Sequence, residues 1–300
     1  MKENIYISVG ISAYNEERNI ANLLEQVLNQ KQKNWKLKEI LVYSDGSSDQ
    51  TVLKAKKVRS KYIKILHDGK RLGKTKRIKQ ICKRVTGDVL VILDADLFIR
   101  SSHVISELVK QFYKNQNVGV VGGNTQPLQP NSFFQRAVYS TFKVFEESRE
   151  KLKGGHNIFG CNGGCIALRR DFIDKITFKN VINEDDFFYF TCLKQGRIFR
   201  HAAKAVVYYK LPTNLKDYLK QSFRSNPDAV ILNFKELFGT RVEEEYHRPF
   251  IFYARSILKA FIANPIGTFY ISAVTLLCKP FYPLISKNFK LSWYTAKSTK

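Results

Sequence analysis

Short apolar strands that alternate with helices constrain the fold of this chain more than any other feature. The sequence predicts strands over residues 5–11, 39–43, 63–66 and 89–93, with helices between them, the first of which is predicted to begin at Asn15. Each predicted strand is almost entirely apolar, which is typical of strands buried on both faces of a sheet. The pattern therefore predicts an α/β protein with a doubly wound, mostly parallel and partly mixed sheet, with helices on both of its faces.

Polar side chains follow three of these strands at the point where each strand ends. Asn15 and Glu16 come after the first strand, Asp45 after the second, and Asp94 and Asp96 after the fourth. In doubly wound sheets, ligands bind outside the carboxyl ends of the strands. The sequence therefore predicts a functional site at this edge of the sheet.

The triplet Asp94-Ala95-Asp96 is the first candidate for metal binding. Two carboxylates on either side of a small residue, directly after a strand, can converge on a hard cation that also binds a diphosphate. An aspartate at this place can equally cap the helix that follows. The residues alone leave both interpretations open.

Two further groups of acids can also be interpreted either as functional residues or as structural ones. Asp45, directly after a strand, can accept hydrogen bonds from a nucleobase or a ribose, or it can cap the next helix. Glu184, Asp185 and Asp186 stand side by side before an aromatic helix. Adjacent like charges raise the pKa of at least one of them, as a general base requires, although a solvated turn explains the run as well.

The order of the motifs along the chain is more specific than any one of them. It resembles that of family 2 glycosyltransferases, which have the GT-A fold, and the resemblance covers residues 5–225. Gln221-x-x-Arg224 is similar to an element of the polysaccharide synthases, with Ser225 in place of its tryptophan, and single addition and polymerisation both remain open. The motifs that carry the resemblance are Tyr14-Asn15-Glu16, Asp45-Gly46-Ser47-Ser48-Asp49, Gly73-Lys74, Asp94-Ala95-Asp96, the glycine-rich segment 154–164, Glu184-Asp185 and Gln221-x-x-Arg224.

The resemblance implies a role for each matching residue. Asp185 is expected to be the catalytic base, with Glu184 beside it, and Asp96 with Asp94 is expected to hold Mg²⁺ or Mn²⁺. Asp45 is expected to contact the nucleobase. The other residues expected to bind the nucleotide sugar, its diphosphate or the acceptor are Ala13, Tyr14, Glu16, Lys74, Asp94, Gln221 and Arg224.

The implied reaction is an inverting transfer of a sugar from a nucleoside-diphosphate sugar, with UDP as the default nucleotide. The expected acceptor is a hydroxyl or phosphate of a lipid-linked molecule or of a growing polysaccharide. A catalytically inactive scaffold with the same fold is the alternative, and the presence of every expected carboxylate argues against it.

The formal net charge of +24 predicts an anionic partner. Residues 54–84 hold fourteen Lys and Arg against one acid, and residues 250–300 hold seven and no acid, so these two segments carry +20 of the +24. A nucleic-acid-binding protein is the alternative that this charge raises. Its concentration in two segments favours phosphorylated substrates and an anionic membrane surface instead, and we expect no nucleic acid partner.

The C-terminal segment differs from the rest of the chain. Residues 260–278 are nineteen positions without a charge, interrupted by Asn264-Pro265. Split there, each half rises only about 20 Å, against about 30 Å for the hydrocarbon core of a bilayer. A membrane span, an interfacial segment and a pair of buried helices remain open, with membrane contact favoured.

These observations divide the chain into a catalytic domain, residues 1–245, and a membrane-associated helical tail, residues 246–300. The five cysteines are widely spread and odd in number, which is typical of free thiols in a reducing compartment. We therefore expect a membrane-associated protein whose catalytic domain faces the cytoplasm.

Overall fold

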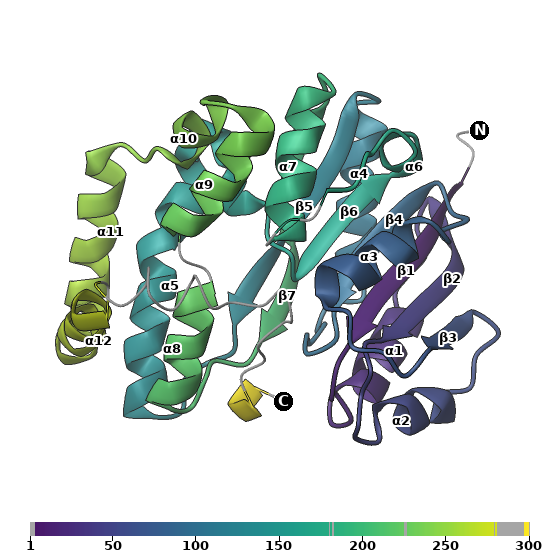
Figure 1. Ribbon diagram of the computed structural model, residues 1–300, viewed down its shortest axis with the longest axis horizontal. Coiled ribbons are helices and arrows are strands. Elements are labelled where there is room, and N and C mark those ends of the chain that lie inside the picture. The colour runs from purple at the N-terminus through teal and green to yellow at the C-terminus, as the bar shows by residue number, and fades with distance from the viewer. Residues whose placement is uncertain are drawn as a thin grey trace. The chain divides into compact units, whose positions relative to one another are not determined.

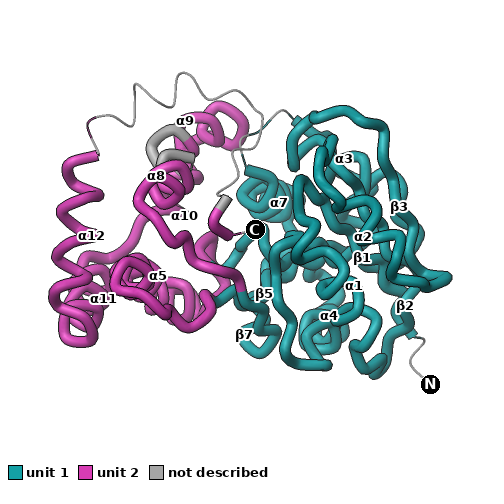
Figure 2. Tube along the Cα trace, turned by 90° about the horizontal axis from the view of Figure 1, so that it is seen from below, with its two compact units in different colours: residues 1–126, 160–208, 300 teal, residues 127–159, 209–299 magenta. Residues whose placement is uncertain are grey.

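A computed structural model describes residues 4–179, 181, 183–224, 227–278, 280 and 297–299. The chain forms two compact units, which Figure 2 distinguishes by colour. Unit 1 comprises residues 1–126, 160–208 and 300, and unit 2 comprises residues 127–159 and 209–299.

Unit 1 is built on a seven-stranded sheet with the strand order β3-β2-β1-β4-β6-β5-β7 (Figure 1). Strand β1 pairs in parallel with β2 and β4, and β3 extends the parallel part beyond β2. Strand β6 runs antiparallel to both β4 and β5, so the sheet is mixed. This confirms the predicted α/β class and mostly parallel sheet. The strands are β1 (Ile5–Ala13), β2 (Trp35–Ser44), β3 (Ile63–His67), β4 (Val89–Asp94), β5 (Val118–Pro127), β6 (Cys165–Arg169) and β7 (Ile198–Tyr209).

Helices cover the sheet of unit 1 on both sides. Figures 1 and 2 show α3 on one face and α4 on the other. Helix α7 begins at Glu184 and therefore includes Glu184, Asp185 and Asp186, which the sequence analysis places before the helix. The helices are α1 (Ile20–Leu28), α2 (Thr51–Lys57), α3 (Lys74–Cys82), α4 (Val104–Lys114), α6 (Arg170–Ile173) and α7 (Glu184–Lys194).

Apolar residues of the central strands form the core that fixes the edge of the sheet. Ile7, Val9 and Ile11 of β1 are completely buried. Gly10, between them, allows α3 to approach closely, because a Cβ atom there would lie 2.6 Å from Cγ2 of Ile81. The first residue of α3 is thereby held close to the end of the parallel strands, where the site lies.

Helix α1 begins later than the sequence indicates. A helix is predicted from Asn15, but α1 begins at Ile20. Asn15 has a φ of 52°, in the left-handed region, and its side-chain Oδ1 accepts a hydrogen bond from the backbone N–H of Ser48 at 2.8 Å. Its own N–H donates to Ser47 Oγ at 3.1 Å. The loop after β1 is therefore fixed to the loop after β2 and is not helical.

Unit 2 is helical in the part that the structure describes. Helices α11 and α12 pack against α5, and the buried residues Ala137, Val138, Leu211, Tyr218 and Ile271 form one core cluster. Its helices are α5 (Phe133–Lys151), α8 (Leu215–Arg224), α9 (Pro227–Phe238), α10 (Arg241–Tyr246), α11 (Phe250–Ala263) and α12 (Pro265–Cys278), together with the short 3-10 helices η1 (Leu152–Gly155) and η4 (Lys297–Thr299).

The C-terminal apolar segment is divided where the sequence predicts the interruption. Asn264 separates α11 from α12, and each helix has 14 residues. Of the helices in the described part of the chain, none combines the length and the hydropathy of a membrane span. Residues 281–296 of the predicted tail lie outside the described residues.

Candidate active site

The candidate active site lies at the carboxyl ends of β1, β2 and β4, where the sequence analysis places it. The strand register sets Ser12 of β1 beside Asp94 of β4 and Ala13 beside Ser44 of β2. Asp45 follows immediately and donates its backbone N–H to the carbonyl of Ala13 at 2.8 Å. The ends of the three strands therefore bring two of the predicted acids to one edge of the sheet.

Lys74 connects this edge to the N-terminus of α7. Its Nζ lies 2.5 Å from Oδ1 of Asp94 and 2.7 Å from Oε1 of Glu184. The lysine is buried, with 8% of its side chain exposed. Burial by itself lowers the pKa of an ammonium group, but the two adjacent carboxylates outweigh this effect and raise the pKa of Lys74 above its ordinary value. Lys74 is therefore a buried cation held between two acids of the site.

Asp185 has the environment that a general base requires. Its Oδ2 accepts a hydrogen bond from the backbone N–H of Gly163 at 2.9 Å. Burial, followed by the charge of Glu184, raises the pKa of Asp185 to about 6, against opposing effects of Lys74 and of the Gly163 hydrogen bond. A carboxyl group with such a pKa is ionised near neutral pH and still accepts a proton readily.

Asp94 is perturbed in the same direction. Burial is the largest cause, and the negative charges of Asp96 and Glu184 add to it, so that the pKa of Asp94 is raised to about 6 although Lys74 opposes the shift. The Oε2 atom of Glu184 is buried and has no hydrogen-bond partner. Both observations show that negative charge at this edge exceeds what Lys74 offsets.

Carboxylate oxygens in such excess fit a divalent cation, because hard cations such as Mg²⁺ prefer oxygen ligands. Three carboxyl groups, of Asp94, Glu184 and Asp185, gather around Lys74, and the charge of Asp96 acts on Asp94. Within the described residues, however, no three or more His, Cys, Asp and Glu side chains are placed as a preformed metal cage. Magnesium sites that use one or two carboxylates together with substrate phosphates need no such cage.

Asp45 is tied to the loop that precedes α3. Its Oδ1 accepts hydrogen bonds from the N–H of Leu72 at 2.7 Å and from Nε of Arg77 at 2.9 Å, and its Oδ2 accepts from the N–H of Gly73 at 3.0 Å. Gly73 has a φ of 93°, in the region that favours glycine. Asp45 thus holds the turn from which Lys74 enters the site, and its predicted contact with a nucleobase stays a prediction.

The sequence analysis did not predict that Arg77 is buried near the site. Its side chain is completely buried, and both terminal nitrogens reach Asp68, at 2.7 Å each. Its guanidinium carbon also lies 4.5 Å from the ring centroid of Tyr43. In the sequence Arg77 is one of fourteen basic residues in a single segment. The one signal that could have separated it from the others is its spacing, because residues three apart in a helix, such as Lys74 and Arg77, lie on the same face.

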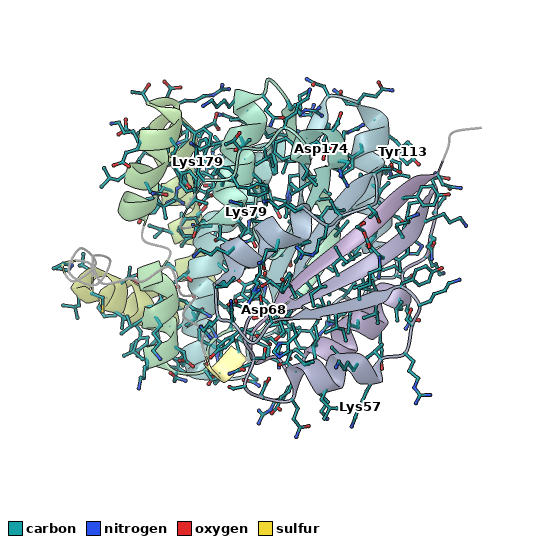
Figure 3. All side chains as sticks on the ribbon, turned by 45° about the vertical axis from the view of Figure 1, so that its right-hand side comes forward. Lys57, Asp68, Lys79, Tyr113, Asp174 and Lys179 are labelled. Carbon is teal, nitrogen blue, oxygen red and sulfur yellow. The ribbon has the colours of Figure 1, made fainter. Side chains whose placement is uncertain are left out.

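Most of the other basic residues in segment 54–84 are partly or fully exposed. Figure 3 shows the side chain of Lys57 pointing outward from α2. Lys74 and Arg77 are the two that the structure buries among acids. The charge of this segment therefore divides into two inward cations and a solvated surface.

The residues expected to line the nucleotide pocket lie beside Asp45. The guanidinium carbon of Arg71 lies 3.3 Å from the ring centroid of Tyr14. Glu16 is buried; its N–H donates to Oγ1 of Thr51 at 2.6 Å, and its Oε2 accepts from Nδ2 of Asn19 at 2.8 Å. These contacts give the loop after β1 a defined shape.

The two remaining predicted residues, Gln221 and Arg224, lie on α8 in unit 2. The side chain of Arg224 lies outside what the structure describes. Their predicted contact with the diphosphate or the acceptor stays a prediction.

The sequence of this chain matches a known enzyme family. The family model for glycosyl transferase family 2 matches residues 8–177, which extend from within β1 to beyond β6 and include Asp45, Lys74 and Asp94. The chain belongs to this family. Family 2 membership confirms the predicted family and enzyme class.

Curated relatives of this family 2 chain are glycosyltransferases. It is 25% identical over 198 residues to UDP-Glc:alpha-D-GlcNAc-diphosphoundecaprenol beta-1,3-glucosyltransferase WfgD of Escherichia coli, an alignment that covers 65% of this chain and 73% of the relative. It is 33% identical over 177 residues to dolichol-phosphate mannosyltransferase of Pyrococcus furiosus, covering 57% of this chain. The chain covers only 48% of this second relative.

Solved structures support the GT-A fold of the family 2 chain. Mannosyltransferase PcManGT from Pyrobaculum calidifontis, in complex with GDP-Man and Mn²⁺, matches with a TM-score of 0.60 at 16% identity, covering 95% of this chain and 80% of that one. Glucosyl-3-phosphoglycerate synthase from Mycobacterium tuberculosis, in complex with Mn²⁺, UDP-glucose and phosphoglyceric acid, matches with a TM-score of 0.56 at 15% identity, covering 78% of this chain and 80% of that one. At this identity the likeness establishes the fold alone.

Proposed function

We propose that this glycosyltransferase carries out an inverting, metal-assisted transfer of a sugar from a nucleoside-diphosphate sugar to a lipid-linked or polysaccharide acceptor. The observation that carries the proposal is the cluster of Asp94, Glu184 and Asp185 around the buried Lys74. A raised-pKa carboxyl group and an excess of carboxylate oxygens stand at one edge of the sheet. These are the two requirements of the reaction.

Asp185 is the proposed base. The acceptor oxygen forms a bond to the anomeric carbon while the bond from that carbon to the diphosphate oxygen breaks. The acceptor proton passes to a carboxylate oxygen of Asp185, and the nucleoside diphosphate leaves with the bonding electron pair. One direct displacement inverts the anomeric configuration and requires no carboxylate nucleophile. Glu184 keeps the charge beside Asp185 negative, which favours proton uptake.

Asp96 and Asp94 are the residues that would hold Mg²⁺ or Mn²⁺. The ion would neutralise charge that develops on the leaving diphosphate. Because Asp94 already contacts Lys74, this lysine is placed to offset negative charge on the same side of the site. We further propose that Gln221 and Arg224 bind the diphosphate or the acceptor.

Ala13, Tyr14, Glu16 and Asp45 are the proposed nucleotide-binding residues. Support for this assignment comes from their position at the carboxyl ends of β1 and β2, where Ala13 ends β1 and the other three follow β1 or β2. UDP is the proposed nucleotide, since the Escherichia coli relative and the Mycobacterium tuberculosis structures are named with UDP-glucose. GDP-mannose, named with the Pyrobaculum calidifontis structure, is the competing donor.

A lipid-linked acceptor is supported by the names of the curated relatives, which contain an undecaprenol diphosphate and a dolichol phosphate. These two acceptor types make different demands on Asp185. A sugar hydroxyl must lose a proton, whereas a phosphate oxygen is already ionised at neutral pH and needs no base. We propose the hydroxyl type, because the site holds a carboxyl group with a raised pKa.

Membrane association, with residues 1–245 catalytic and facing the cytoplasm, belongs to the same proposal. Support comes from the names of the relatives and from the acid-free, basic C-terminal segment, residues 250–300. An enzyme of a lipid-linked acceptor meets its substrate at the bilayer surface.

The decisive experiment measures transfer by the purified full chain. Radiolabelled UDP-glucose and GDP-mannose are each offered with Mn²⁺ to a polyprenyl-diphosphate sugar and to a polyprenyl phosphate. We expect transfer to the sugar hydroxyl, lost in Asp185→Asn and in Asp96→Asn, with Lys57→Met as a surface control that retains it. Equal transfer by Asp185→Asn and the parent to the hydroxyl acceptor would overturn the assignment of the base.

A further inference from the structure

The outer surface of α11 and α12 is unusually apolar. Ten of the sixteen large hydrophobic residues that are exposed in the described part of the chain lie on these two helices. Seven of them, each 61–80% exposed, define what we call the α11–α12 face: Phe250, Leu258, Ile262, Ile266, Phe269, Leu276 and Leu277. Large exposed apolar residues gathered on two neighbouring helices mark a site of interaction with a protein or a membrane.

The two helices share this face. Helix α11 runs vertically in Figure 1 and α12 runs vertically in Figure 2, and in both views they line the same edge of unit 2 with α5 on their inner side. Both helices therefore lie at the surface of unit 2, and together they form one broad outer side.

Four of the five buried residues of α11 and α12 are small or polar, and the fifth is Ile271, which belongs to the core cluster of unit 2. Ser256, Ala260, Gly267 and Thr268 are buried, and Oγ1 of Thr268 donates to the carbonyl of Ala260 at 2.9 Å. Ten large apolar residues of these helices are therefore exposed, although a helix that packs on an aqueous globular core turns most of such residues inward. Mostly small residues inside and large apolar residues outside are typical of helices that contact lipid.

The charges around the α11–α12 face select the kind of membrane. Residues 247–278 contain no Asp or Glu, and Arg255 on α11 is exposed; Lys259 is exposed as well, and its Nζ lies 3.5 Å from Oε2 of Glu147 on α5. Basic side chains next to an apolar face bind anionic headgroups while the apolar residues enter the acyl boundary. A second copy of a chain with a net charge of +24 would bring like charges together.

We infer that the α11–α12 face docks on an anionic phospholipid bilayer, with both helices lying in the interface. The lengths agree with this orientation, because a helix of 14 residues extends about 21 Å. The inference deepens the proposed membrane association by naming the surface. Its test measures binding to vesicles and needs no sugar transfer. The inference can therefore fail while the proposed reaction stands, and the proposed reaction can fail while the inference stands.

The test compares two sets of substitutions in the full chain. Leu258→Glu with Ile262→Glu places two acids on the α11–α12 face, and Leu53→Glu places one on α2, where the leucine is 51% exposed. Each variant is sedimented with vesicles of phosphatidylcholine alone and of phosphatidylcholine with phosphatidylglycerol, at low and at raised salt. Circular dichroism and the melting temperature establish that the variants are folded.

We expect the parent and Leu53→Glu to bind the vesicles that contain phosphatidylglycerol. Raised salt should weaken this binding without abolishing it, because apolar insertion is not screened. The double variant should bind at least about tenfold more weakly, because two acids then replace apolar side chains that enter the acyl boundary. Binding of the folded double variant that equals the parent's would overturn the inference. So would a parent that ignores vesicles and sediments as a dimer which the double variant disrupts, because the occupant would then be a second copy.

Discussion

Lys74 Nζ lies 2.7 Å from Oε1 of Glu184, so that one buried ammonium group joins the start of α3 to the start of α7. The same nitrogen lies 2.5 Å from Asp94 at the end of β4. The consecutive elements α3 and β4 and the distant helix α7 are therefore held together by one charge. The lysine is part of the architecture of the site as well as a candidate phosphate contact.

Replacing Lys74 by methionine should lower stability most when no divalent cation is present. The variant Lys74→Met leaves buried carboxylates without their cation, and we expect a loss of about 3 kcal/mol in the free energy of unfolding in a chelator. Manganese should restore part of this loss, because an ion that binds the folded state stabilises it by mass action. Urea unfolding with EDTA and with Mn²⁺ measures both effects.

The matched control for this prediction is Lys57→Met, at an exposed position of α2. It should change the free energy of unfolding by no more than about 0.5 kcal/mol in either buffer. A Lys74→Met protein as stable as the parent in EDTA would show that the carboxylates do not depend on the ammonium group.

The pH dependence of transfer should report Asp185. Its folded pKa is raised to about 6, so the carboxyl group is protonated below that pH and ionised above it. We expect kcat/KM for a hydroxyl acceptor to fall as the pH is lowered through this value, because a base must be ionised to accept a proton. Asp185→Asn should lower kcat by about 10²–10⁴-fold and remove this limb of the profile. A profile that is unchanged in Asp185→Asn would assign the limb to another group.

The sequence predicts the site well wherever it depends on strand ends. The positions of Asp45 and Asp94 follow from apolar strands that end in acids, and parallel pairing with β1 brings both to one edge. The sequence alone does not predict that Asp185 lies near Asp94, and this expectation came from the resemblance to a family. Asp185 lies on α7, which follows β6 in the chain. Strand β6 joins the sheet by antiparallel pairings with β4 and β5, which the sequence analysis did not identify.

The sequence predicts less well where the fate of a charge depends on tertiary contacts. Lys74 and Arg77 stand among twelve other basic residues and have no local feature that indicates burial. Their burial follows from acids that lie far away in the sequence, Glu184 for the lysine and Asp45 for the arginine. The helix predicted from Asn15 is likewise overturned by a contact with Ser48, which belongs to the next loop.

Removal of divalent cations should abolish transfer and leave the fold intact. Asp94 and Asp96 lie at the end of a strand whose pairings with β1 and β6 are made by the backbone. We therefore expect EDTA to eliminate product formation while the far-ultraviolet circular dichroism is unchanged, and excess Mn²⁺ or Mg²⁺ to restore activity. Transfer that persists after exhaustive chelation would exclude the proposed metal assistance.

Arg77 should be more important for stability than any exposed basic residue near it. It is completely buried and forms ion pairs with Asp45 and Asp68. Arg77→Leu should lower the free energy of unfolding by about 3 kcal/mol, because a buried carboxylate loses its partner. Arg77→Lys should recover little, since an ammonium group cannot reproduce the planar fork.

Lys76→Leu is the control for Arg77, because this lysine is the preceding residue of α3 and is exposed. Chemical denaturation should place it within about 0.5 kcal/mol of the parent. If Arg77→Leu unfolds at the same denaturant concentration as Lys76→Leu, the buried ion pairs contribute nothing to stability.

Glu39 predicts how the stability of unit 1 depends on pH. This buried carboxylate of β2 accepts hydrogen bonds from Ser8 Oγ at 2.9 Å and Thr86 Oγ1 at 2.7 Å, and Lys64 Nζ lies 2.8 Å from it. Burial by itself raises the pKa of a carboxyl group, but these partners outweigh it and lower the pKa of Glu39 below 4.5. The folded state therefore favours the ionised form more than the unfolded state does.

A carboxyl group with a lowered folded pKa stabilises the protein above its unfolded pKa, and this stabilisation is lost as the pH falls through the folded pKa. Glu39→Gln should thus be about 2 kcal/mol less stable than the parent at about pH 7, because hydrogen bonds to a charged acceptor are weakened. The difference should shrink as the pH is lowered below about 4.5, because the folded pKa lies under the unfolded one. Urea unfolding of both proteins across this range measures it, and a difference that stays constant with pH would show that Glu39 acts only through packing.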